Sequence, residues 1–300
     1  MKPKEWAVFL ALGLIWGSSF LWIKIAIQEL DAFTLVGWRL LFGTLGMVVV
    51  ILVRRPPLPR TWRTWASLAL LGIINTALPF VLISWGEKSI DSAVASVLNS
   101  TVPLFTLVLA HFALHDEPIT ARKAAGLLIG FGGIVVLMAR DLEAGVLRAG
   151  ALGQLAVLLA ALSYASASVF ARRTMREVPP LVQAFVPMAI ADAIVWTVAT
   201  QVGDPGRLPA IPLTWVALLW LGLLGSCVAY LLFYNLLHSV GATRTTMVTY
   251  VFPVVGVTLG VLFLNELADW HLLAGAALVV ASLVVVNWKP RAVAVAAPAD

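Results

Sequence analysis

Charged side chains are scarce in this sequence. They make up 12% of its 300 residues, about half the share found in a soluble globular domain. Hydrophobic residues make up 61%, and the mean hydropathy is +0.97. So little charge cannot cover a soluble globule of this size with polar surface. The composition therefore argues against a soluble enzyme, a disordered protein and a nucleic-acid-binding module, and it predicts an integral membrane protein.

Cysteine is almost absent as well. Cys227 is the only one, so an intrachain disulfide and a cysteine metal cluster are both excluded. We expect Cys227 to be a small packing residue. The first apolar stretch is too long for a signal peptide and lacks a small-residue cleavage site, so no cleavable leader is expected. No residue pattern indicates a metal site or a cofactor.

Long apolar stretches are what the sequence has in place of charge. A helix needs about 20 apolar residues to cross a hydrocarbon core of roughly 30 Å. The stretches found here are continuously apolar, unlike the alternating segments of a β-barrel. They predict ten membrane-spanning helices, at 6–27, 32–53, 64–86, 92–114, 120–139, 150–172, 180–202, 212–237, 242–264 and 269–287.

The basic residues of the connecting segments indicate an orientation. If the N-terminus is cytoplasmic, the inner segments hold fourteen Lys and Arg residues and the outer segments hold four. By the positive-inside rule this distribution predicts that both termini are cytoplasmic. The net charge of +5 is then a topology signal, and nucleic-acid binding is the weaker explanation.

The two halves of the chain resemble each other, which predicts five-helix units at 1–145 and 146–288 followed by a cytoplasmic tail at 289–300. Five spans are an odd number, so the second unit enters the membrane from the opposite side. Inverted repeats are typical of secondary transporters, with the substrate site near the midplane between the halves. A channel would need a ring of pore-lining groups, and none is visible. The matched pairs are Trp65 with Trp215, Gly72 with Gly222, Pro103 with Pro253, and Asp116-Glu117 with Asn265-Glu266.

Several short motifs recur in order in the two halves. The first half carries Trp16-Gly17-Ser18-Ser19-Phe20, Arg39, Ala93-Val94-Ala95-Ser96, Pro103 and Glu117-Pro118-Ile119-Thr120 before Gly126, and the second carries Gly241-Ala242-Thr243, Pro253, Glu266 and Gly275.

In these motifs and their spacing, residues 6–288 resemble the drug/metabolite transporter superfamily, in its ten-span type with two EamA repeats. The resemblance implies an all-α integral membrane protein of ten helices in two inverted five-helix repeats, with spans five and ten to one side as support. It implies a bacterial inner-membrane exporter of metabolites, most like the exporters of amino acids, including aromatic ones. No catalytic motif such as HExxH or GxSxG is present, so we expect no enzyme.

Three charged side chains fall well inside the predicted spans, where charge is expensive and usually functional. Lys24 and Arg39 lie toward the outer ends of their helices. They could attract a substrate carboxylate at the outer mouth, or pair with Glu29, Asp31 or helix-end carbonyls across the turn between spans one and two. Asp192, near the middle of span seven, could carry a proton or be a neutral, hydrogen-bonded acid that faces a neighbouring helix.

Two further acidic residues, Glu117 and Glu266, follow an apolar span and open the next one. A carboxylate at such a place stabilises the free amides of a helix N-terminus, so we expect both to be structural caps.

Polar and aromatic groups gathered at mid-span are the candidate substrate-binding residues. Hydroxyls and carbonyls freed by proline would fix the orientation of a solute, and aromatic rings would form apolar walls. The alternative is that the small residues only allow close helix packing. The candidates are Trp16, Ser18, Ser19, Asn75, Pro79, Trp85, Asn99, Ser100, Tyr164, Tyr230, Tyr234, Thr249 and Tyr250.

The expected partners are a small solute and the lipid bilayer. The midplane holds one carboxylate and no pair of basic residues, which favours a neutral or zwitterionic substrate over a phosphate. Purines and cationic drugs remain alternatives to amino acids. A facilitative uniporter or channel remains an alternative to alternating access.

Overall fold

The computed structural model describes residues 2–114, 119–143, 149–206, 208–240, 245 and 247–287, and every regular element in these ranges is helical. The predicted ten-span, all-helical architecture is confirmed. The candidate membrane spans are Pro3–Ala26, Ala32–Arg54, Trp62–Gly86, Ser92–Ala113, Ala121–Ala139, Gly150–Thr174, Pro180–Val202, Pro212–Phe233, Met247–Leu264 and Trp270–Asn287.

Several spans consist of more than one element. The first repeat contains α1 (Pro3–Gly17), α2 (Ser19–Ala26), α3 (Ala32–Arg54), α4 (Trp62–Gly72), η1 (Ile73–Ala77), α5 (Leu78–Gly86), α6 (Ser92–Asn99), α7 (Val102–Ala113) and α8 (Ala121–Glu143). The second contains α9 (Ala149–Thr174), α10 (Pro180–Val202), α11 (Pro212–Leu219), η2 (Trp220–Val228), α12 (Ala229–Val240), η3 (Met247–Tyr250), α14 (Val251–Leu264) and α15 (Trp270–Asn287).

A local hydrogen bond that recurs 150 residues apart shows the repeat in atomic detail. The indole Nε1 of Trp65 donates to the carbonyl of Pro59 at 3.0 Å, and that of Trp215 donates to Pro209 at 3.1 Å. Both bonds brace the connection that leads into the third span of a repeat. The same sequence shift therefore matches the same local structure.

The third span of each repeat is interrupted by a π-helical stretch at the matching place. A shift of 150 carries η1 onto residues 223–227, which lie inside η2. Wider π-helical turns are rare and often mark functional sites. In the first repeat Pro79 follows the stretch. Proline lacks an N–H and its ring displaces the carbonyl four residues earlier, so a regular α-helix cannot run through this point.

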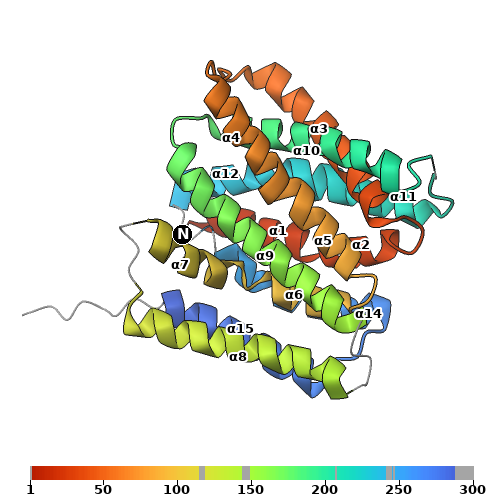
Figure 1. Ribbon diagram of the computed structural model, residues 1–300, viewed down its shortest axis with the longest axis vertical. Coiled ribbons are helices and arrows are strands. Elements are labelled where there is room, and N and C mark those ends of the chain that lie inside the picture. The colour runs from red at the N-terminus through yellow and green to blue at the C-terminus, as the bar shows by residue number, and fades with distance from the viewer. Residues whose placement is uncertain are drawn as a thin grey trace, which may run out of the picture.

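Helices α8 and α15 pack against each other at one side of the bundle (Figure 1). Glycine permits the close approach. A β-carbon on Gly133 would lie 3.0 Å from the Gly275 carbonyl oxygen, and one on Gly275 would lie 3.1 Å from the Gly133 carbonyl oxygen. These are spans five and ten, in the lateral position that the family resemblance implies.

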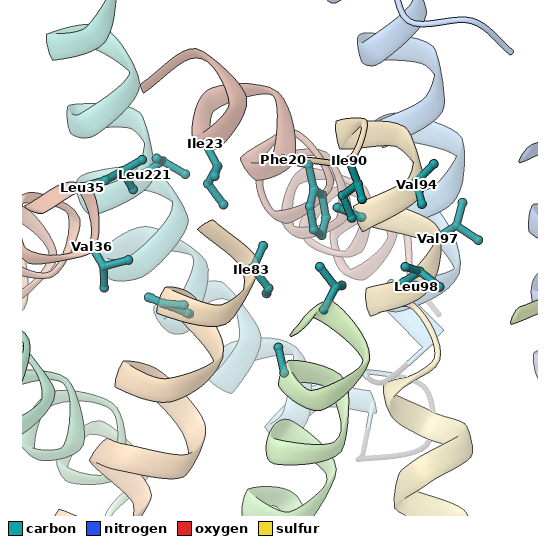
Figure 2. Packing of buried hydrophobic residues seen from close by; sticks show 14 of the residues in the cluster. Phe20, Ile23, Leu35, Val36, Ile83, Ile90, Val94, Val97, Leu98 and Leu221 are labelled. Atoms are coloured by element: carbon teal, nitrogen blue, oxygen red, sulfur yellow. The ribbon is translucent and has the colours of Figure 1, made fainter. Parts of the chain in front are cut away.

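The two ends of the bundle are packed differently. We call the end with the turns after α2, α5 and α10 the distal end, and the opposite end, where α1 begins, the proximal end; the N-terminus lies to the left in Figure 1. One continuous cluster of buried apolar residues lies mostly in the distal half. Figure 2 labels ten of its members, from α2, α3, α5, α6, η2 and the turn before α6. Toward the proximal end the described core divides into smaller clusters around Leu12, Met47, Leu68 and Ala110.

Candidate functional site

Arg39 is the charged residue at the centre of the candidate site. It lies on α3 and only 5% of its surface is exposed. Its Nε donates to the Ser226 hydroxyl in η2 at 3.2 Å, and its Cζ lies 3.8 Å from the centre of the Phe80 ring. Among the described residues, no partner takes a hydrogen bond from its two terminal amino groups. Arg39 therefore lies inside the protein between the two repeats, and its guanidinium fork is available.

Aromatic rings surround this part of the interior. Trp16 on α1 meets Tyr230, Phe233 and Phe252 with ring centroids 6.1, 5.7 and 6.3 Å apart. The Tyr164 and Tyr230 phenols are close enough to Arg39 to interact with it electrostatically. The aromatic residues thus come from both repeats and form apolar walls near a cation.

The junction between α1 and α2 is tied to η2 by two indole groups. Trp16 Nε1 donates to the Gly225 carbonyl at 3.0 Å, and Trp220 Nε1 donates to the Ser18 hydroxyl at 3.1 Å. Ser18 and Ser19 in turn donate to the Ile15 carbonyl at 2.9 and 3.2 Å. These two predicted site residues therefore lie beside the site with their hydroxyl protons already engaged.

The first π-helical stretch contacts the same region. Asn75 Nδ2 lies 3.5 Å from the Tyr230 hydroxyl, and the Ser163 hydroxyl donates to the Ile74 carbonyl at 2.6 Å. A π-helical turn leaves carbonyls that a regular α-helix would use, and here a serine of α9 satisfies one of them. The structure thus brings together Trp16, Arg39, Asn75, Tyr164 and Tyr230, while Pro79 lies in the first turn of α5, directly after η1.

The residues of spans four and nine are placed differently. Asn99 is buried at the end of α6, and its amide oxygen has no hydrogen-bond partner in the described structure. The Ser100 hydroxyl donates to the Val97 carbonyl at 2.6 Å. Tyr250 donates to the Leu283 carbonyl of α15 at 2.7 Å, so its hydroxyl faces the lateral helix pair.

Three further candidates are not part of the cluster around Arg39. Trp85 is 44% exposed on α5. Thr249 is half-buried in η3, the short element before α14. The side chain of Tyr234 and the whole of Glu117 lie outside the described residues.

Lys24 contacts a turn that the sequence analysis did not consider. Its ammonium donates to the backbone carbonyls of Glu87 and Ile90 at 2.6 and 2.7 Å. These carbonyls belong to the turn between α5 and α6 and not to the turn between spans one and two. Lys24 therefore pairs with helix-end carbonyls, as one of the two alternatives expected, but these carbonyls come from the turn between α5 and α6.

Asp192 lies on α10 and is directed toward Thr44 and Trp196. It is 8% exposed, and one of its oxygens has no hydrogen-bond partner in the described structure. Thr44 is on α3, which packs closely along α10. Asp192 therefore faces a helix–helix contact.

The distal end carries helix caps that connect the two repeats. Glu266 accepts hydrogen bonds from the Ser92 and Ala93 amides at 2.7 and 2.9 Å, so it caps α6 of the first repeat. The helix that follows Glu266 in sequence, α15, is capped by Asp269, which accepts from the Leu272 amide at 2.9 Å. Glu266 is thus a helix cap, as expected, but the helix that it caps is distant in sequence.

A second cap of this kind runs in the other direction. Glu29, after α2, accepts from the Ala210 amide at 3.1 Å and the Ile211 amide at 3.2 Å, and it bonds the Thr214 hydroxyl. It therefore caps α11 of the second repeat. Sequence reasoning considered Glu29 only as a partner for Lys24 or Arg39. The match of Thr64 with Thr214 under the 150-residue shift was the signal that could have drawn attention to α11.

Taken together, the ten helical spans and the two inverted repeats indicate a class of protein: a multi-span membrane transporter. Comparison with known proteins supports that class. The chain belongs to the EamA-like transporter family, which matches residues 5–139 and 151–288. This confirms the resemblance drawn from the motifs, and the family is one of transporters.

Relatives from several organisms match along nearly the whole chain. The uncharacterized inner membrane transporter YedA of Escherichia coli K12 is 28% identical over 87% of this chain and 82% of its own length. The uncharacterized transporter YoaV of Bacillus subtilis is 24% identical, with 90% and 92% covered. A solved crystal structure superposes with a TM-score of 0.66 at 21% identity, covering 95% of this chain and 98% of that chain; this likeness shows the fold.

Proposed function

We propose that this protein is a secondary transporter that exports neutral or zwitterionic metabolites across the bacterial inner membrane, namely amino acids with an apolar or aromatic side chain. The observation that carries the proposal is the buried Arg39 with a free guanidinium fork between aromatic walls. A guanidinium binds a carboxylate through two parallel hydrogen bonds. The rings of Trp16, Phe80 and Tyr230 supply the surface that an apolar side chain needs.

The distribution of the core supports transport by alternating access. The distal half is held by one continuous apolar cluster and by the caps of Glu29 and Glu266. The proximal half is held by separate clusters. We interpret this state as closed at the distal end. With cytoplasmic termini, as the basic residues predict, the distal end is external, and the central site would open to the cytoplasm at the proximal end.

The experiment that tests the proposal is counterflow in proteoliposomes. Vesicles are loaded with an unlabelled compound, and uptake of a labelled amino acid is measured. Each aromatic amino acid is compared with its decarboxylated amine and with its amide. We expect saturable exchange for the amino acids and little for the amines. Exchange of amines, purines or cationic drugs in preference to amino acids would refute the assigned cargo, and exchange that does not saturate would favour a pore.

A variant of Arg39 links the result to the site. A hydrogen bond to a charged group contributes about 1.5–3 kcal/mol, which is roughly 10- to 150-fold in affinity. We expect Arg39→Gln to lose that much affinity for the amino acid. The variant should then bind the amino acid and its decarboxylated amine equally. Trp85→Phe is the matched control, because Trp85 is an exposed aromatic residue away from Arg39. Wild-type discrimination in Arg39→Gln would contradict the assignment.

A further inference from the structure

The turn after α5 contains a carboxylate that none of the preceding roles uses. Glu87 follows the last residue of α5 and has an exposed fraction of 0%. Neither of its carboxylate oxygens has a hydrogen-bond partner among the described residues. Its backbone carbonyl, by contrast, accepts from the Lys24 ammonium at 2.6 Å. A carboxyl group thus lies in the closed distal core without a hydrogen-bond donor among the described residues.

The charges that face Glu87 come from three elements. Lys24 of α2 and Arg39 of α3 attract an ionised Glu87, and Glu266, after α14, repels it. Helix α9 meets the same turn with Gly153 and Val157 beside Gly86, and these residues carry no charge. The positive and negative neighbours therefore oppose each other.

Physical chemistry favours the neutral acid in these surroundings. A buried carboxylate without hydrogen bonds is costly, and such groups usually take up a proton instead. Burial raises the pKa of Glu87 well above its usual range; Lys24 opposes the rise, Glu266 adds to it, and Arg39 opposes it. If the distal end opens, water reaches the group and this cost of ionisation falls.

Lys24 links the Glu87 turn to the distal surface. Lys24 lines a cavity of about 300 Å³ there, together with Gln28, Asp91 and Glu266. The ammonium of the same Lys24 holds the carbonyls of Glu87 and Ile90. The contacts that close the distal end are therefore the contacts that keep water from the Glu87 carboxyl group.

We propose that Glu87 is a proton-binding residue of the distal gate: it holds a proton while that end is closed and releases it to water on the distal side when that end opens. The proposal rests on the transport function proposed above. On this basis a low external pH favours the closed distal end and a high external pH favours the open one. The ratio of the two states changes by at most about tenfold per pH unit for one proton.

The first test is counterflow at a series of external pH values with wild-type protein, Glu87→Gln and Glu87→Asp. We expect wild-type exchange to slow as the external pH falls. Glu87→Gln keeps a neutral group of the same shape, so its exchange stays at the low-pH rate at every pH. Glu87→Asp keeps a carboxyl group, so its exchange remains dependent on pH. Asp91→Asn, on the same turn but lining the cavity, is the matched control and retains the pH dependence. Wild-type pH dependence in Glu87→Gln would overturn the proposal.

A second measurement separates this proposal from the transport function. Infrared difference spectra of the purified protein report protonated carboxyl groups directly. We expect a carboxylic acid band at neutral pH that disappears in Glu87→Gln and remains in Asp91→Asn. If the band is present but no compound shows counterflow, the proton site stands and the transport proposal fails. If counterflow is found and Glu87→Gln leaves the band unchanged, Glu87 is ionised and the proton site is refuted.

Discussion

The cap that Glu266 places on α6 leads to a quantitative prediction about the distal gate. Glu266→Ala leaves the Ser92 and Ala93 amides without their acceptor, and both residues are completely buried. A buried donor without a partner costs about 1–3 kcal/mol. In an open state water would satisfy the same amides, so the cost falls on the closed state alone. A total near 3 kcal/mol shifts the equilibrium toward the open state by roughly 150-fold.

Thiol accessibility measures this shift, because the chain has a single native cysteine. Cys227→Ser removes it, and Ser84→Cys introduces a thiol on α5 at a position that is completely buried. We expect Glu266→Ala to accelerate labelling of that thiol by a membrane-impermeant reagent by one to two orders of magnitude. The reagent is added from the distal side of reconstituted vesicles.

The matched control for this prediction is Asp269→Ala. Asp269 also caps a helix through a carboxylate, but its helix, α15, follows it directly in sequence. Its loss lowers stability by about 1 kcal/mol without favouring either state. Equal labelling rates in Glu266→Ala and Asp269→Ala, after correction for unfolded protein, would show that the cap between repeats does not hold the distal end closed.

Three further outcomes are expected. Asp31 caps α3 through the Phe33 and Thr34 amides at 2.9 and 3.0 Å, so Asp31→Ala costs about 1 kcal/mol, read as a lower melting temperature in detergent. Burial raises the pKa of Asp31, but its hydrogen bonds, led by those of Thr34, hold the pKa below the usual value. The loss of stability in Asp31→Ala is therefore present at neutral pH, and it shrinks at low pH as the wild-type carboxylate takes up a proton. Gly275→Val places side-chain atoms against the Gly133 carbonyl and should cost about 1–3 kcal/mol, whereas an unchanged melting temperature would contradict the close contact between α8 and α15. Asp192→Asn should leave the pH dependence of exchange unchanged if Glu87 is the proton-binding group, and a flattened profile would assign the proton to Asp192.

The spans were predictable because each depends on a property of a continuous segment. Apolar length alone fixes where a helix can cross the membrane, and the observed bounds of the seventh span, Pro180–Val202, are those predicted. The interruptions within spans were less accessible. Pro79 and Pro103 indicate breaks in their spans. No proline lies within η2 or directly after it, and the extent of η2 depends on packing against α3 that no local pattern records.

The site was partly predictable for a related reason. Intramembrane charge and mid-span aromatic residues drew attention to Arg39, Trp16 and Tyr230, which the structure brings together. Glu87 was missed because it lies one residue beyond an apolar run, where a carboxylate is ordinarily solvated. Its burial follows from the folding of the α5–α6 turn onto Lys24, a contact across 63 residues.

The cap formed by Glu29 also bears on the state in which the proximal end is closed. Under the repeat shifts, Glu29 corresponds to Glu177, and the α11 residues that it caps correspond to Arg60, Thr61 and Thr64 at the start of α4. Glu177 is exposed here, while the Thr64 amide is held by the Thr61 hydroxyl at 3.3 Å. Exchanging the roles of the two repeats would place Glu177 on α4 and release Glu29 from α11. If the protein works by the alternating access proposed above, the two inverted repeats thus supply, in one chain, the helix caps of both end states.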